Sequence, residues 1–369
     1  MSAANFTQFL TALGAYESGI DTTKVQTADW MQYLRVFDPR YGNVNPTSVS
    51  LSNTQDLIML QYHVHNTLGF LGKYQFGEAL LIDLGYYVPA ASGYYGTTST
   101  NEWKGAWTGK NGVHSKADFM TSVQELAIRE AFAMNVGVIN TYLAQAGKTI
   151  DDYIGHQFTY TRLGETHVAT VTMSGILAGA HLQGPTGVAQ LFLHNIQSSD
   201  EYGTNILFYI DKYGGYNTPF GTAANDTLVG SDYSETFMGA GGHDTYTTGA
   251  GLDKIIITKG LGGIDTITDF DVKNDVISLS NFAGVAFKDL VITNVSGHAV
   301  VKFPNGQTIN IMNHTAAEIG VQQFVYGPYK ITWNANSGDT LINSFNIKYD
   351  LIDLSYAPFQ PRSATVVIN

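Results

Sequence analysis

GTAANDTLV (221–229), GSDYSETFM (230–238), GAGGHDTYT (239–247) and TGAGLDKII (248–256) follow one another without a break, and GLGGIDTIT (260–268) repeats the pattern after three more residues. Each nonapeptide has one acidic residue at its sixth position and an apolar residue two positions later. The five acids are Asp226, Glu235, Asp244, Asp253 and Asp265. A fixed period with one acid and one apolar residue predicts stacked turns, each containing a loop and a β-strand.

The acids of these repeats predict a cation site. Stacked turns are expected to bring carboxylates of successive repeats about one strand spacing apart, roughly 4.8 Å. Close carboxylates repel one another unless a cation lies between them, and carboxylates with backbone carbonyls are the ligands that Ca²⁺ prefers. The predicted calcium ligands are Asp226, Asp244, Asp253, Asp265 and Asp269. A solenoid with solvated acids and no metal is the alternative.

The repeats resemble the repeats-in-toxin (RTX) family, with its consensus GGxGxDxUx, where U is a large apolar residue. The segment ITDFDVKNDVISLS (267–280) is similar to the one that closes such arrays. The first repeat has Ala224 in place of glycine, and the second has Tyr233 in place of glycine and Glu235 in place of aspartate. The resemblance implies Ca²⁺ as the cofactor, a weak or empty row at Glu235, and secretion from a Gram-negative bacterium by the type I secretion machinery.

The N-terminal half has a helical pattern. Phe6, Phe9, Leu10 and Leu13 recur at helical spacing after Asn5, which predicts a capped amphipathic helix. Alternating strand patterns come after the repeats instead. The predicted fold class is multidomain α+β: a mainly α domain over 1–215, a parallel β-roll over 216–282, and a terminal β-domain over 283–369. Further helices are expected over 115–138, 174–182 and 187–196, and strands over 275–280, 363–369 and a hairpin, 298–312, with Asn305-Gly306 at its turn.

Glu17 is an acidic residue on the apolar face of the first predicted helix. It follows Leu13 by four residues and Leu10 by seven, so it lies on the apolar face, at the end of the helix before Ser18-Gly19. Apolar surroundings and the negative helix terminus favour the protonated carboxyl group. A neutral carboxylic acid in a cleft is what protonation of a glycosidic oxygen needs.

Four segments resemble the lysozyme-like muramidases and lytic transglycosylases, in the order of that superfamily: ALGAYESG (12–19), LGKYQFGEALL (71–81), FMTSVQELAIREAF (119–132) and GILAGAHLQGPTGV (175–188). The resemblance implies that Glu17 is the general acid, that Tyr74 and Gln75 face the substrate, and that His181 takes the place of a usual tyrosine. A second carboxylate would decide between hydrolysis and transglycosylation, and Asp21 and Glu78 are weak candidates for it.

These observations predict a secreted, calcium-dependent enzyme that cleaves the β-1,4 link between MurNAc and GlcNAc in peptidoglycan glycan strands. Both lytic transglycosylation and muramidase hydrolysis fit, as do attack on competing bacteria and remodelling of the producer's wall. The non-enzymatic alternative is a calcium-stabilised RTX adhesin or surface protein whose lysozyme-like domain only binds glycan. A third possibility is an enzyme acting on another polysaccharide, such as chitin.

Composition excludes several other classes. The net charge is −12, with 31 acidic and 19 basic residues, which opposes binding to nucleic acid. Because there is no cysteine, disulfide scaffolds, thiolate zinc sites and cysteine nucleophiles are excluded. The first residues, MSAANFTQFLTALG, lack the pattern of a signal peptide, and no apolar run is long enough to predict a membrane span.

Overall fold

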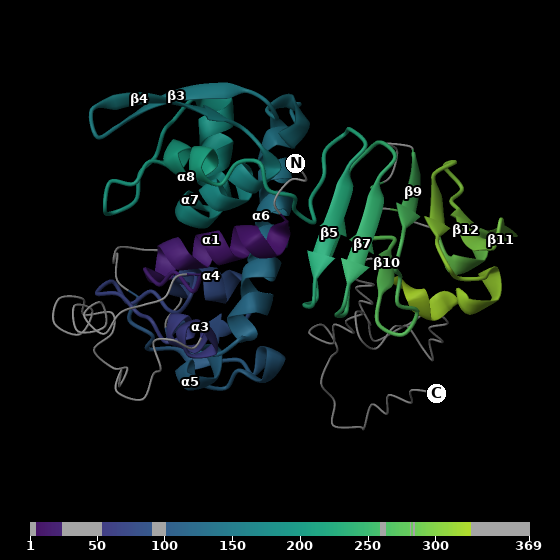
Figure 1. The fold of residues 1–369 in the computed structure, drawn as a ribbon, viewed down its shortest axis with the longest axis horizontal. Helices are drawn as coiled ribbons and strands as arrows, with labels where there is room; N and C mark the ends of the chain where they lie inside the picture. The colour runs from purple at the N-terminus through teal and green to yellow at the C-terminus, as the bar shows by residue number, and fades with distance from the viewer. Residues whose placement is uncertain are drawn as a thin grey trace, which may run out of the picture.

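The computed structural model describes residues 5–23, 54–90, 101–258, 263–280, 282 and 285–325. Helices from the first half of the chain form one unit, and the strands that begin at residue 227 form a second unit beside it (Figure 1). The strands alternate between two sheets that contain parallel pairs, as a β-roll requires. None of the helices in these ranges is long and apolar enough to cross a membrane.

Helix α1 (Phe6–Ser18) confirms the predicted amphipathic helix. Asn5 caps it, since its side chain accepts a hydrogen bond from the backbone of Gln8 at 2.9 Å and the Gln8 side chain accepts one from the backbone of Asn5. The helix ends at Gly19, whose φ of 72° is a left-handed conformation that glycine adopts without strain. Phe9 and Leu13 are fully buried on the inner face.

The long helices α6 and α7 form the centre of the helical unit and pack against each other. The predicted helix 115–138 is interrupted after α5, and its second part continues to residue 145 as α6. The predicted helices 174–182 and 187–196 are the two halves of α7, which is kinked at Gly184 (φ 69°) before Pro185. The elements of this unit are α1, α3 (Thr54–Tyr62), α4 (Glu78–Asp83), β1 (Tyr87–Val88), β2 (Ala106–Trp107), α5 (Lys116–Phe119), α6 (Val123–Gln145), β3 (Gln157–Arg162), β4 (Glu165–Thr170), α7 (Met173–His194) and α8 (Ile206–Lys212).

In the second unit, each nonapeptide contributes one strand, and consecutive strands join opposite sheets. Strands β5 (Thr227–Ser231), β7 (Thr245–Gly249) and β9 (Ile264–Ile267) lie in one sheet, and β6 (Thr236–Met238), β8 (Lys254–Ile256) and β10 (Val276–Ser278) in the other. Strand β5 pairs in parallel with β7, with Thr227 opposite Thr245, so one full turn takes two repeats. The acids that stack are therefore those of alternate repeats, and the expectation that successive acids stack is corrected.

The apolar residue of each repeat points between the two sheets. Phe237 and Ile255 are fully buried on one side, and Leu228, Tyr246 and Ile267 are buried on the other. This alternation explains the nine-residue spacing, because each strand has one inward-facing large side chain.

Later strands extend both sheets. Strands β11 (Val291–Val295), β12 (His298–Lys302) and β13 (Thr308–Ile311) continue the first sheet, and β14 (Phe324–Val325) continues the second. The antiparallel pairing of β12 with β13 confirms the predicted hairpin, in which Gly306 has a φ of 91°. The predicted strand 363–369 lies outside the described residues.

Candidate functional site

A cleft of about 520 Å³ opens beside the end of α1. Helix α1 contributes Glu17, the kinked helix α7 contributes His181, and α8 contributes Tyr209. The rest of the lining comes from turns and loops: Asn66, Thr67, Phe70, Gln75, Asp200, Glu201, Tyr202 and Thr204, with Tyr16 and Leu182 from the helices. Three of the four residues predicted to form a glycan site, Glu17, Gln75 and His181, thus line one cleft.

Glu17 is held by neutral groups. The Tyr209 hydroxyl donates a hydrogen bond to its Oε1 at 2.6 Å. Burial raises the pKa of Glu17 to about 7; this hydrogen bond opposes the rise, and the negative charge of Asp200 adds to it. At neutral pH a large fraction of the molecules therefore carries a protonated Glu17, as a general acid must be.

His181 lies close to Glu17 without forming an ion pair. Its Nε2 is 3.7 Å from Oε1 of Glu17, but burial lowers the pKa of His181 to about 4, so the ring is neutral at pH 7. A hydrogen bond to the backbone of Tyr74 orients the imidazole. The ring therefore forms a polar but uncharged part of the cleft wall beside Glu17. Because it carries no positive charge, it does not lower the raised pKa of Glu17.

Gln75 lies in a tight turn that presents it to the cleft. Leu71 and Phe76 pair across this turn, and Gln75 itself has a φ of 51°, which is uncommon for a residue with a side chain. Its Nε2 donates to the carbonyl of Gly72 at 2.8 Å. Its Oε1 is buried and has no hydrogen-bond partner among the described residues. This leaves a buried acceptor unsatisfied at the wall of the cleft.

Tyr74 differs from the expectation that it faces the substrate. Its ring is fully buried, its hydroxyl donates to Oε2 of Glu125 at 2.8 Å, and the residue does not line the cleft. Adjacent residues in extended or turn backbone point in different directions. Only one of the two matched positions is consequently available to a ligand.

Asp21 and Glu78, the two weak candidates for a second carboxylate, do not line the cleft. Oδ1 of Asp21 accepts hydrogen bonds from the backbone and hydroxyl of Thr23. Glu78 is buried, and its Oε2 accepts from the backbone N–H of Trp103 at 3.0 Å. Both have local structural roles.

The carboxylates that do join Glu17 are Asp200 and Glu201, which were not predicted from the sequence. Oδ1 of Asp200 accepts hydrogen bonds from the backbone N–H groups of Thr204 at 2.7 Å and Tyr202 at 3.0 Å, which fixes the carboxylate in its loop. The only sequence signal is a polar SSDEYGT run (198–204), which is typical of many loops.

The roll contains two stacks of acids. In one stack, Oδ1 of Asp244 accepts from the backbone N–H of Asp226 at 2.9 Å, and Oδ1 of Asp265 accepts from that of Asp244 at 3.1 Å. In the other, Asp253 accepts from Glu235 at 2.7 Å, and Asp275 accepts from Asp253 at 3.2 Å. In each stack, the second and third acids thus hold the turn before them by a hydrogen bond to its backbone.

Asp253 has the environment expected of a cation ligand. Its side chain is fully buried, and its Oδ2 has no hydrogen-bond partner among the described residues. Burial raises the pKa of Asp253 to about 8, and the charges of Asp275, Glu235 and Asp269 add to the rise. Burial likewise raises the pKa of Asp244 to about 7, with contributions from Asp265 and Asp226. An orphaned carboxylate oxygen among like charges fits a hard cation with oxygen ligands.

Asp269 lies outside both stacks. Its carboxylate accepts from the backbone N–H groups of Thr248 at 2.7 Å and Gly249 at 3.0 Å, where β7 ends. Within the described ranges, no three acidic or histidine side chains converge closely enough to hold a metal by themselves. Backbone carbonyls would have to complete a coordination shell, as they commonly do for Ca²⁺.

Comparisons with known proteins add a distant likeness. No family model matches the chain, and no curated protein matches it. Among solved structures, the chain is similar to the AlgE6R3 subunit of the Azotobacter vinelandii mannuronan C5-epimerase, with 22% identity over 41% of this chain and 97% of that one, at a TM-score of 0.20. The AlgE6R2 subunit of the same enzyme has 16% identity over 30% of this chain and 92% of its own, at a TM-score of 0.18.

Proposed function

We propose that the helical unit cleaves the β-1,4 bond between MurNAc and GlcNAc in peptidoglycan, with Glu17 as the general acid. The observation that carries this proposal is a carboxyl group whose side chain is only 14% exposed, with a pKa of about 7, that lines a cleft of about 520 Å³. Glu17 donates its proton to the glycosidic oxygen as the bond to the anomeric carbon breaks, and the bonding electron pair leaves with that oxygen.

Gln75 provides the polar contact that selects the substrate. A rotation of its side-chain amide toward the cleft that it lines would let Oε1 accept an N–H or O–H group, and the acetamido groups and hydroxyls of these sugars supply both. The rings of Tyr16 and Tyr202, which are 41% and 67% exposed, line the same cleft and are available to pack against a sugar face.

Asp200 determines which nucleophile completes the reaction. In hydrolysis, its carboxylate accepts a proton from the water that attacks the anomeric carbon. In transglycosylation, the C6 hydroxyl of the muramic acid attacks instead and returns its proton to Glu17, which closes a 1,6-anhydro ring. The presence of Asp200 in the same cleft as Glu17 favours hydrolysis, because hydrolysis uses two carboxyl groups and Asp200 supplies the second one.

The test is a peptidoglycan zymogram of the wild type and Glu17→Gln, combined with mass spectrometry of the soluble products. The variant should clear no peptidoglycan, while its melting temperature stays equal or rises, because a neutral amide replaces a buried acid. Equal clearing by both proteins, or by neither, would reject the enzymatic proposal; the latter result with retained glycan binding would favour the adhesin alternative. Clearing of chitin only would reassign the substrate.

We also propose that the roll binds Ca²⁺ through its two stacks, with Asp253 as the principal ligand. Bound calcium supplies positive charge between stacked carboxylates and so contributes to folding. Low cytosolic calcium would leave the roll less stable until the protein has passed through a type I secretion channel, and the protein would then act outside the cell. Export that continues after deletion of the type I secretion genes in the producing bacterium would refute this route.

A further inference from the structure

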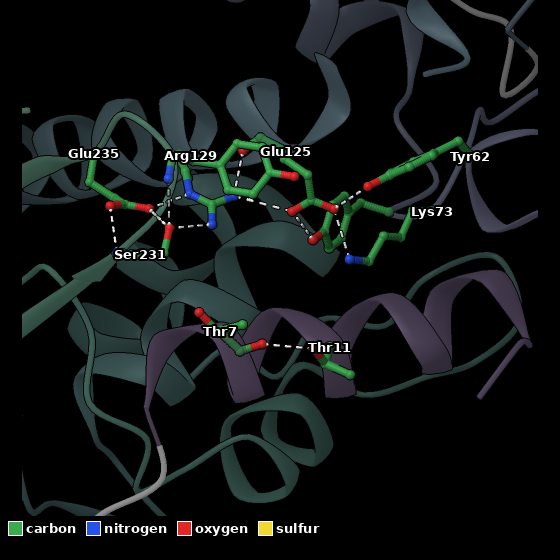
Figure 2. A network of polar contacts seen from close by, with 10 residues as sticks. Thr7, Thr11, Tyr62, Lys73, Glu125, Arg129, Ser231 and Glu235 are labelled. Atoms are coloured by element: carbon green, nitrogen blue, oxygen red, sulfur yellow. Dashed lines mark hydrogen bonds and ion pairs between the residues drawn. The ribbon is translucent and has the colours of Figure 1, made fainter. Parts of the chain in front are cut away.

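Arg129 of helix α6 joins the helical unit to the roll. Its Nε contacts Oε1 of Glu235 at 2.5 Å, and its Nη2 donates to the Ser231 hydroxyl at 3.0 Å. Its Nη1 turns back to Oε2 of Glu125 at 3.1 Å. The side chains of Arg129 and Glu235 are 4% and 1% exposed, so the ion pair is shielded from solvent (Figure 2).

The same network reaches the turn that presents Gln75. Glu125 accepts a hydrogen bond from Lys73 at 2.8 Å and another from the Tyr74 hydroxyl at 2.8 Å. Figure 2 shows Glu125 between Arg129 and Lys73. Because Lys73 and Tyr74 directly precede Gln75, the contacts form a continuous path from the roll to one wall of the cleft.

The charges of this network balance only when both units are present. Arg129 and Lys73 are the cations, and Glu125 and Glu235 the anions. Without Glu235, two buried cations share a single carboxylate. Leaving a buried charge uncompensated is strongly destabilising, whereas removing a complete pair is often tolerated.

The second repeat is adapted to this contact. Two of the positions at which it departs from the RTX consensus, Tyr233 and Glu235, touch Arg129: the Tyr233 ring centroid lies 4.6 Å from the guanidinium carbon, and Glu235 forms the ion pair. The departures are therefore explained by docking, whereas the sequence alone predicted only a weak or empty cation row.

We propose that the turn 231–235 of the roll is a docking element for the helical unit, and that Glu235 and Arg129 are positioning residues for the Gln75 wall of the cleft. This inference rests on the proposed function for its catalytic consequence. The cleft becomes competent only when the roll is folded, since Glu235 reaches Arg129 from within a stacked turn. The enzyme would thus be held inactive until the roll folds.

A double-mutant cycle in the full-length chain tests the charge balance. Glu235→Gln and Arg129→Gln should each lower the melting temperature by roughly 10 °C. The double variant should lose clearly less than the sum, because Lys73 and Glu125 remain paired. The control is Glu130→Gln, a change next to Arg129 on helix α6. It removes an ion pair with Lys110 whose two side chains are each 34% exposed, and it should change the melting temperature little. Additive losses would overturn the inference.

A second measurement tests positioning and does not depend on catalysis. In hydrogen exchange at a temperature where all variants are folded, Glu235→Gln should speed exchange of the amides in the turn 72–76, and the double variant should restore protection. Cleavage by Glu235→Gln should show a KM raised about threefold, because a displaced Gln75 keeps only part of its contact with the substrate. Unchanged exchange in this turn would refute the positioning role. If the wild type cleaves no glycan, the proposed function fails, while the exchange result still decides the inference.

Discussion

The cleft and the roll both bury carboxyl groups with raised pKa values, yet they surround them differently. Glu17, with a pKa of about 7, has neutral partners in Tyr209 and His181. Asp253, with a pKa of about 8, is stacked with further acids and retains an oxygen without a partner among the described residues. An acid with neutral hydrogen-bonding partners can hold and release one proton, whereas stacked acids call for a cation. The surroundings, more than the pKa itself, separate the two chemistries.

Calcium removal should have the largest effect, and it should act on the roll. Chelation with EGTA is expected to lower the melting temperature by about 10 °C, since a ligand that binds only the folded state stabilises it. Asp253→Asn should shrink this difference, because it removes an orphaned ligand. Asp232→Asn, which removes an exposed acid of the same roll, is the control and should leave the difference unchanged. An identical melting curve with and without EGTA would contradict the calcium proposal.

When EGTA has removed the calcium, lowering the pH should restore part of the lost stability, because the carboxyl group of Asp253 is then protonated. The pKa of Asp253 is raised from 3.8 to about 8 in the folded protein, so the folded state binds its proton more tightly than the unfolded state does. The resulting stability is complete below pH 3.8 and is lost as the pH rises toward 8. The fall in melting temperature between pH 5 and 8 should be steeper in the wild type than in Asp253→Asn. Parallel pH profiles would show that Asp253 is not the titrating group.

Asp200→Asn should have the next largest effect, and it should act on the cleft. Loss of a catalytic base is expected to slow hydrolysis about a hundredfold. The products should shift toward 1,6-anhydro ends, and the pKa seen in the alkaline limb should fall because the charge of Asp200 raises that of Glu17. Glu201→Gln, a neighbouring change in the same cleft, should leave this pKa in place. Unchanged rates and products in Asp200→Asn would limit Asp200 to a structural role.

Gln75→Ala should have the smallest effect. One lost hydrogen bond to substrate is expected to raise KM about fivefold, with kcat nearly unchanged. Steady-state kinetics on solubilised glycan strands measures both constants. A loss confined to kcat would place Gln75 in the chemical step and contradict its assignment to binding.

Local patterns predicted the parts of this molecule that depend on nearby residues. The spacing of Leu10, Leu13 and Glu17 was enough to place the acid on the inner face of α1, and the nonapeptide period was enough to predict parallel strands in stacked turns. Both features result from backbone geometry, which repeats along the chain.

Features that depend on distant contacts could not be predicted. Asp200 is 183 residues from Glu17, and nothing in its loop distinguishes it from an ordinary polar turn. The partner of Glu235 is 106 residues away, so its departure from the consensus was visible while its cause was not. Tyr74 was misplaced because a sequence match fixes a position in the chain but not the direction of its side chain.

The most direct test of the proposed acid is an NMR titration of the Glu17 carboxyl carbon, assigned by its absence from Glu17→Gln. The carboxyl group should titrate near pH 7, where burial in the cleft places its pKa. A midpoint near 4.5, the ordinary value for glutamate, would mean that the group is ionised at neutral pH and would contradict its role as the proton donor.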